Sequence, residues 1–291
     1  MNLSFIKNLE VDEIRSGFLV TSHQKRLWNA QIGLILEFDR ICKKHDLKYF
    51  AVAGTLLGVA RHGGFIPWDF DVDLVMPRPD YEKFKLIAKD EVHYPFCSDL
   101  WYENVEYGDE APETFPLLPF IKFRDERTYM LVDKDHPKFD QGIAIDIFPY
   151  DSFPPFDDEP NSKDLELQFR SIYEIYFAAC HTKFIREELA HPTGEFMLGR
   201  ETVQRIYDLS LKTRGILLEK SAAKFYHESS TISLLIHLSL RNTIKFKREW
   251  FDETIYLPFE NISLPVPKKF DEVLTAQYGD WRFTSKSIEY R

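Results

Sequence analysis

The sequence of 291 residues contains few cysteines and no long apolar run. Its three cysteines, Cys42, Cys97 and Cys180, are widely spaced, which excludes a disulfide framework and the close spacing of a structural zinc site. No apolar stretch approaches the roughly 20 residues of a membrane-spanning helix, and the N-terminal segment lacks the apolar core of a signal peptide. We therefore expect a protein of a reducing compartment that is cytoplasmic, or peripheral at the inner face of the membrane.

Positive charge is also scarce. The chain has 37 lysines and arginines against 47 aspartates and glutamates, a formal net charge of -10. General nucleic-acid binders carry basic faces that displace counterions from phosphates, so we expect no nucleic-acid partner. For membrane contact there is one weak candidate, TISLLIHLSL at 231–240. We interpret it as a buried helix, with a surface helix that binds anionic lipid headgroups as the alternative.

The first half of the sequence alternates strand and helix patterns. Apolar residues at three- and four-residue spacings predict a helix from about 22 to 44, with Thr21 and Gln24 placed as a capping box. Short apolar runs predict strands near 48–54, 71–77, 119–133 and 142–150. From about 163 to 250 the periodicity becomes helical, and the last helix ends at Gly279.

These patterns predict an α+β fold with a mixed β-sheet core flanked by helices. We expect an N-terminal extension at 1–21 and a single domain at 22–291. That domain would contain a core at 22–150, a helical insertion at 160–250 and a C-terminal return at 251–291.

Three aspartates at alternate positions, Asp69, Asp71 and Asp73, stand out in the segment GTLLGVARHGGFIPWDFDVDLVMP. Alternate residues of an extended chain share one face, and two like charges about 5 Å apart repel by roughly 3 kcal/mol at an effective dielectric near 20. Asp146, inside the apolar run GIAIDIFPY, also needs a partner. Neither strand supplies an obvious cation.

We therefore predict a divalent cation held by Asp69, Asp71, Asp73 and Asp146, and all-oxygen ligation favours Mg²⁺ or Mn²⁺. Such a site would bind phosphates through the metal and leave one carboxylate to accept a proton from an attacking hydroxyl. A turn followed by a strand with solvated aspartates is the alternative interpretation of the aspartate run alone.

Basic and hydroxyl side chains near these acids are candidates for contacts with phosphate. Lys122 and Arg124 share a face if FIKFRD is a strand, and Arg61 ends the short helix that follows Gly54 and Thr55. Structural ion pairs are the alternative for the three basic residues, and a helix cap is the alternative for Thr55.

The segment GTLLGVARHGGFIPWDFDVDLVMPRPDYEKF resembles the signature of the LicD family, whose relatives include the fukutin-related proteins. The resemblance continues through FIKFRD, GIAIDIFPYDSFP and FENISLPVPKKFDEVLTAQYGDW in the order of the family, and it is weakest across the helical insertion. Phe70 stands where many bacterial members have an acid. The resemblance implies a nucleotidyltransferase-like fold in which Gly54-Thr55, Asp71, Asp73 and Asp146 match the Gly-Ser/Thr turn, the paired acids and the third acid.

The resemblance also implies an activity: transfer of phosphocholine, ribitol phosphate or glycerol phosphate from a CDP-linked donor to a hydroxyl of a glycan or lipid-linked glycan, with release of CMP. Asp71 and Asp73 would be metal ligands, Asp146 a ligand or the general base, and Asp69 an additional ligand. Gly54, Thr55, Arg61, Lys122 and Arg124 would bind the donor. The alternatives are a nucleotidyltransferase that moves the nucleotide itself, and an inactive scaffold that binds a glycan.

Overall fold

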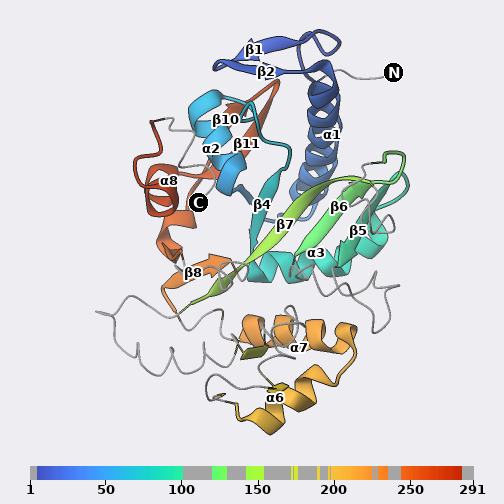
Figure 1. Cartoon of the computed structure of the whole chain (residues 1–291), viewed down its shortest axis with the longest axis vertical. Coiled ribbons are helices and arrows are strands. Elements are labelled where there is room, and N and C mark those ends of the chain that lie inside the picture. Colours follow the sequence, from blue (N-terminus) through green and yellow to red (C-terminus); the bar gives the residue numbers. More distant parts are fainter. Residues whose placement is uncertain are drawn as a thin grey trace. The chain divides into compact units, whose positions relative to one another are not determined.

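A computed structural model describes residues 5–100, 120–129, 142–153, 198–224, 229–234 and 244–283, with single positions at 172, 174, 175, 189, 190, 196 and 226 (Figure 1). The chain divides into two compact units. The first comprises Met1–Ser98, Lys122–Phe148 and Trp250–Arg291, and the second comprises Asp99–Ile121 and Pro149–Glu249. Every acidic residue of the predicted site belongs to the first unit.

The first unit is built on a sheet with the strand order β3, β4, β7, β6, β5. In this order the strands span Phe50–Ala51, Asp73–Pro77, Ile143–Ser152, Ile121–Asp125 and Phe96–Leu100. β3 pairs antiparallel with β4, with Phe50 opposite Val75. With the helices that flank it, this sheet confirms the predicted α+β fold.

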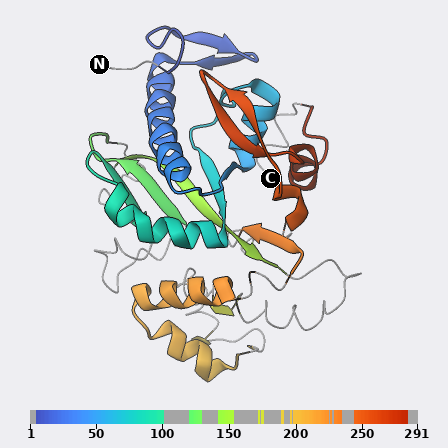
Figure 2. The same ribbon diagram turned by 180° about the vertical axis from the view of Figure 1, so that it is seen from behind.

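Two helices, α1 (Ser22–Lys44) and α3 (Arg78–Glu91), pack on the sheet (Figures 1 and 2). The ring of Phe38 on α1 lies 5.1 Å from the ring of Phe84 on α3 and 5.9 Å from the ring of Phe123 on β6, both edge to face. Because the side chain of Phe123 can point to only one face of the sheet, both helices cover that face. Their packing fixes the position of α1 relative to the strands.

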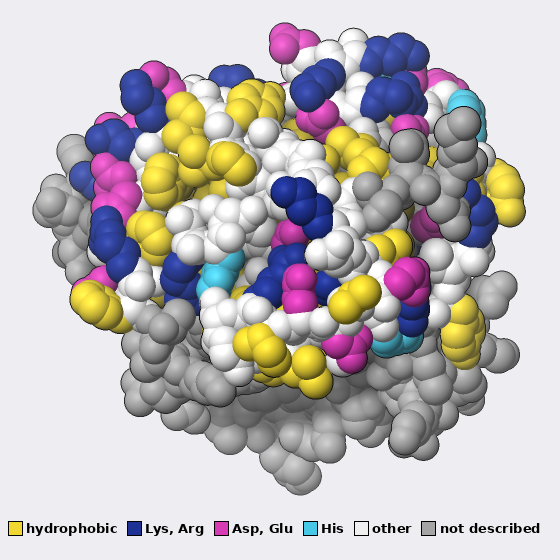
Figure 3. Space-filling view, turned by 90° about the horizontal axis from the view of Figure 1, so that it is seen from above, with side chains coloured by type: hydrophobic (Ala, Val, Ile, Leu, Met, Phe, Trp, Pro, Cys, Tyr) yellow, Lys and Arg dark blue, Asp and Glu magenta, His cyan; other side chains and the backbone are white. Residues whose placement is uncertain are grey.

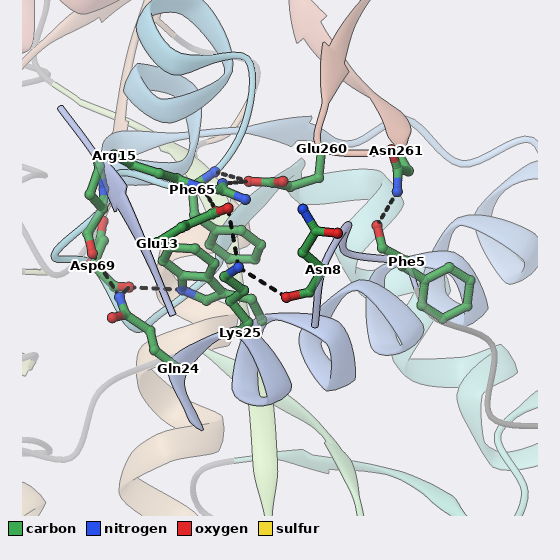
Figure 4. Close-up of polar contacts among 12 residues, drawn as sticks. Phe5, Asn8, Glu13, Arg15, Gln24, Lys25, Phe65, Asp69, Glu260 and Asn261 are labelled. Carbon is green, nitrogen blue, oxygen red and sulfur yellow. Dashed lines mark hydrogen bonds and ion pairs between the residues drawn. The ribbon is translucent and has the colours of Figure 1, made fainter. Parts of the chain in front are cut away.

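Two hairpins and two further helices complete this unit. They are β1 (Glu13–Arg15) with β2 (Phe18–Val20), β10 (Thr254–Phe259) with β11 (Ile262–Pro267), α2 (Ala53–His62) and α8 (Phe270–Tyr278). Glu260, at the turn of the second hairpin, accepts from Arg15 at 2.5 Å and from the Phe65 N–H at 3.2 Å (Figure 4). The C-terminal return thus anchors the turn that leads into the aspartate run.

The second unit contains α6 (Arg200–Tyr207), α7 (Leu211–Lys224), β8 (Thr231–Leu234) and β9 (Phe246–Lys247), with a 3-10 helix at Arg248–Phe251 where it returns to the first unit. Ile172, Val203 and Leu218 are among the residues of its apolar core. The expected helix at 231–240 is wrong over Thr231–Leu234, which form a strand between β7 and β9. All four residues are buried, and a short apolar run buried on both faces has no periodicity that separates strand from helix. Residues 235–240 and most of 163–180 lie outside the described residues.

The surface gives two observations that bear on partners. On the face drawn in Figure 3, lysines and arginines lie interspersed with acidic side chains. Within the described residues, no helix combines the length and the apolar character needed to cross a membrane.

Candidate active site

The aspartate run lies between α2 and β4. β4 begins at Asp73, two residues later than the strand predicted over 71–77. Asp71, which was predicted to lie in the strand, therefore lies with Asp69 in the segment that leads into it. Asp71 and the intervening Phe70 are exposed, whereas Asp69 and Asp73 are partly buried. The three carboxylates therefore range from a solvent-facing group to a group at the edge of the core.

Main-chain hydrogen bonds hold Asp73 and Asp146 on neighbouring strands. The N–H of Asp73 donates to Thr55 Oγ1 at 2.9 Å, and its carbonyl accepts from the N–H of Val52 at 3.2 Å. The N–H of Asp146 donates to the carbonyl of Val72 at 2.9 Å. The third acid is thus beside the aspartate run, on the adjacent strand of the sheet, as the resemblance implies.

The aspartates disturb one another electrostatically. Burial, followed by the negative charges of Asp71, Asp146 and Asp69, raises the pKa of Asp73 well above its usual value, and Lys122 opposes that shift. Burial and the neighbouring Asp71 carboxylate raise the pKa of Asp69 to about 8, although the N–H groups of Phe70 and Asp71 oppose this shift. Burial and mutual repulsion thus both disfavour the ionised forms of Asp69 and Asp73.

Part of the missing counter-charge comes from a third strand. Lys122 on β6 places Nζ 3.3 Å from Asp146 Oδ1. Sequence reasoning placed Lys122 near phosphate or in an ion pair, and the structure shows an ion pair with an acid of the predicted site. Lys122 also lowers the electrostatic repulsion at Asp73, whose pKa shift it opposes.

One face of α1 holds the main chain of the acidic loop, residues 67–72. Gln24 Nε2 donates to the carbonyl of Pro67 at 2.8 Å and more weakly to that of Asp69 at 3.4 Å (Figure 4). Trp28 Nε1 donates to the carbonyl of Asp69 at 3.0 Å. Gln31 Nε2 donates to the carbonyl of Phe70 at 2.8 Å.

These three donors were missed by sequence reasoning. Gln24, Trp28 and Gln31 are 5%, 0% and 2% exposed, and their spacing of four and three residues places them on one side of the helix. The available signal was the presence of two glutamines on an otherwise apolar stripe. Gln31 Oε1 is buried without a partner, a state that costs about 1–3 kcal/mol.

The predicted donor-binding residues have different positions. Gly54 packs directly against the carboxylate of Asp69. Thr55 is the third residue of α2, so it is not the N-cap of this helix. Its hydroxyl oxygen accepts from the N–H of Asp73 and so contacts the aspartate run. Arg61 donates to His62 Nε2 at 3.1 Å and to the carbonyl of Trp281 at 3.3 Å. Lys122 and Arg124 share the less buried face of β6, as predicted.

The acidic cluster suits a divalent cation in its chemistry, without forming a finished coordination shell. Among the residues that the structure describes, no three histidine, cysteine or acidic side chains form a group that could hold a metal ion. The candidate donor set is nevertheless all carboxylate. Burial first, and then the neighbouring aspartates, raise the pKa values of Asp69 and Asp73, and a cation would favour their ionised forms. Hard, oxygen-bound cations such as Mg²⁺ and Mn²⁺ fit these ligands.

Comparisons with known proteins match the part of the chain that contains this cluster. Residues 46–153 match the family described as LicD/FKTN/FKRP, nucleotidyltransferase domain. The lipopolysaccharide cholinephosphotransferase LicD of Haemophilus influenzae is 26% identical over 258 residues, which cover 86% of this chain and 88% of that protein. The human ribitol 5-phosphate transferase FKRP is 61% identical over 28 residues, only 10% of this chain and 6% of that protein. Residues 46–153 of this chain are therefore a nucleotidyltransferase domain of the LicD family.

Proposed function

We propose that this protein is a phosphotransferase that moves a phospho-alcohol from a CDP-linked donor to a hydroxyl of a glycan or lipid-linked glycan and releases CMP. The observation that carries the proposal is the group of four aspartates on β4, β7 and the loop before β4, inside the LicD-family domain. Two similar proteins support the substrate class, because one is named as a cholinephosphotransferase of lipopolysaccharide and the other as a ribitol 5-phosphate transferase. Both names describe transfer of a phosphate that carries an alcohol.

Asp71 and Asp73 would hold Mg²⁺ or Mn²⁺, with Asp69 and Asp146 as further ligands. The bound cation would neutralise charge on the donor phosphates. Thr55 fixes the main chain of Asp73, and Lys122 adds positive charge on the same side as Asp146. In this proposal Thr55 would hold the main chain of one ligand, Asp73, and Lys122 would pair with the carboxylate of Asp146.

The chemistry needs one bond to form and one to break. The acceptor hydroxyl attacks the phosphorus that bears the alcohol, the phosphorus–oxygen bond to CMP breaks, and the hydroxyl proton moves to a carboxylate. We assign that proton to Asp146 when Asp71 and Asp73 hold the metal. Lys122, with Nζ 3.3 Å from Asp146 Oδ1, would orient this carboxylate.

The acceptor and its location follow from the same proposal. A glycan on a lipid carrier would be met at the inner face of the membrane by an enzyme that remains in the cytoplasm or peripheral to the bilayer. Fractionation of the native protein as an integral membrane or exported species would contradict this location.

Identification of the leaving group tests the reaction itself. The protein is incubated with Mg²⁺, an acceptor glycan and either a CDP-alcohol or a nucleoside triphosphate, and the products are identified by mass spectrometry. We expect CMP and a phospho-alcohol on the acceptor. Release of pyrophosphate with transfer of a nucleotide would support the second candidate, which the family description of a nucleotidyltransferase domain favours.

An inactive glycan-binding scaffold is the remaining candidate. It would release neither product, and the four aspartates would then have no metal to bind. A titration with Mg²⁺ that leaves the melting temperature unchanged would favour the scaffold.

A further inference from the structure

We propose that Gln31 is a positioning residue for this reaction, because its side-chain amide holds the peptide between Asp69 and Asp71. The inference rests on the proposed function of the acidic cluster. Gln31 lies on α1, is 2% exposed, and donates from Nε2 to the carbonyl of Phe70 at 2.8 Å. No side chain of the acidic cluster takes part in this contact, so the aspartates stay available for a ligand.

The folding of α1 does not explain an amide at this position. Gln31 lies on the same buried stripe as Trp28, Ile35 and Phe38, where an apolar side chain would pack without a polar atom to satisfy. Its Oε1 is buried without a partner. Burial of the unpaired Oε1 is destabilising, and an apolar side chain at this position would remove that cost. The same change would take the donor away from the Phe70 carbonyl, which is a cost of similar size.

The contact has a specific mechanical consequence for the acids. Asp73 is held from the other side by Thr55 and by Val52. Without the bond to Gln31, the peptide between Phe70 and Asp71 can rotate. The carboxylate of Asp71 then moves relative to Asp73 and to Asp69, whose carbonyl Trp28 still holds. A displacement of about 1 Å in a catalytic constellation can reduce a rate about 100-fold.

Gln31 is a better test position than the other two donors of α1. Gln24 also belongs to the N-terminus of the helix, where its N–H donates to Thr21 Oγ1 at 3.2 Å. Trp28 stacks on Phe65 at 4.7 Å between ring centroids, so its replacement would disturb the core. Gln31 donates to the Phe70 carbonyl and has a buried, unpartnered oxygen, so its replacement removes this one contact of the loop.

The test compares Gln31→Met with Gln277→Met in the full chain. Methionine keeps the length and the helix propensity of glutamine and removes the amide. Gln277 lies on α8 and also has a buried Oε1 without a partner, so it is a matched control. Three quantities are measured: hydrogen exchange of the amides at 67–72, the melting temperature with and without Mg²⁺, and kcat and KM for CMP release.

For Gln31→Met we expect exchange at 67–72 to be about tenfold faster and kcat/KM to fall about 10- to 100-fold. The metal-free melting temperature should stay close to that of wild type, because removal of the unpaired Oε1 offsets the loss of the bond to Phe70. The increase in melting temperature caused by Mg²⁺ should become smaller. Gln277→Met should match wild type in exchange and in kcat/KM.

Two results would overturn the inference. One is unchanged exchange at 67–72 in Gln31→Met, and the other is a metal-free melting temperature well below that of wild type, which would make Gln31 a residue of the fold. If wild type releases no CMP from any CDP-alcohol, the proposed function fails, whereas the exchange rates and the Mg²⁺-dependent melting still decide whether Gln31 positions the loop.

Discussion

Gly54 lies so close to Asp69 that a Cβ atom at position 54 would be 2.6 Å from Asp69 Oδ2. A side chain at this position would therefore push the carboxylate out of its place. We predict that Gly54→Ala lowers kcat/KM for CMP release about 100-fold, because a shift of about 1 Å in the aspartate is enough for such a loss. Steady-state kinetics of the variant test this prediction.

Gly33→Ala is the matched control for that substitution. A Cβ at Gly33, in the middle of α1, would have its nearest contact at 3.9 Å, to Phe5 Cε2. Alanine is about 1 kcal/mol more favourable than glycine in a helix interior, so this variant should melt higher and keep wild-type kinetics. Equal activity of Gly54→Ala and wild type would show that the close contact with Asp69 has no role in catalysis.

Asp71→Asn should separate chemistry from folding. The amide keeps the shape of the side chain but removes a charged ligand, so turnover should fall by orders of magnitude. The charge of Asp71 contributes to the raised pKa values of both Asp69 and Asp73, so its removal relieves repulsion and the metal-free protein should melt at the same or a higher temperature. Scanning calorimetry in chelator checks this, and melting far below wild type would make Asp71 a structural residue.

The raised pKa of Asp69 predicts how metal-free stability varies with pH. Burial and the charge of Asp71 raise this pKa to about 8 in the folded protein, from an ordinary value of 3.8. Between these two values the folded state retains a proton that the unfolded chain releases, so the contribution of Asp69 to stability falls as pH rises from about 4 to 8. The Asp69→Asn variant has no carboxyl group at this position, so its stability does not fall with pH for this reason.

The advantage in melting temperature of Asp69→Asn over wild type should therefore grow from pH 5 to pH 8 in the presence of chelator. Mg²⁺ should reduce that growth, because it stabilises the ionised carboxylates of wild type. A difference that is the same at every pH would contradict the raised pKa.

Lys122→Met should lower the metal-free melting temperature and increase the stabilisation by Mg²⁺. The substitution removes the ammonium 3.3 Å from Asp146 and with it the positive charge that opposes the shift of Asp73. We expect a lower metal-free melting temperature, a larger increase on addition of Mg²⁺, and a kcat/KM reduced about tenfold or more. Calorimetry and kinetics of this variant test the prediction. A smaller increase in melting temperature with Mg²⁺ would contradict the idea that Lys122 and the metal supply positive charge to the same aspartates.

Local signals in the sequence predict part of this structure well. The helix expected at 22–44 is α1, and Thr21 caps it by accepting from the N–H of Gln24. The last helix ends at Gly279, which has the positive φ of 69° expected for such a position. Such signals are reliable because both partners of the interaction lie within one turn of helix.

Contacts between distant segments could not be predicted from the sequence. The predicted capping box is only half present, since the side chain of Gln24 donates to Pro67, 43 positions away. The ion pair between Lys122 and Asp146 joins two strands whose order in the sheet no local pattern specifies. Spacing along the chain predicted which acids gather, whereas the groups that position them depend on the tertiary structure.

Release of CMP tests the central proposal most directly. Wild type and Asp71→Asn are incubated with CDP-choline, CDP-ribitol or CDP-glycerol and an acceptor glycan, with Mg²⁺ or after exhaustive chelation, and CMP is quantified by mass spectrometry. We predict that wild type releases CMP from at least one donor only when the metal is present, and that Asp71→Asn loses this activity by orders of magnitude. Full turnover after chelation, or equal release by Asp71→Asn, would contradict a metal-dependent reaction at the aspartate cluster.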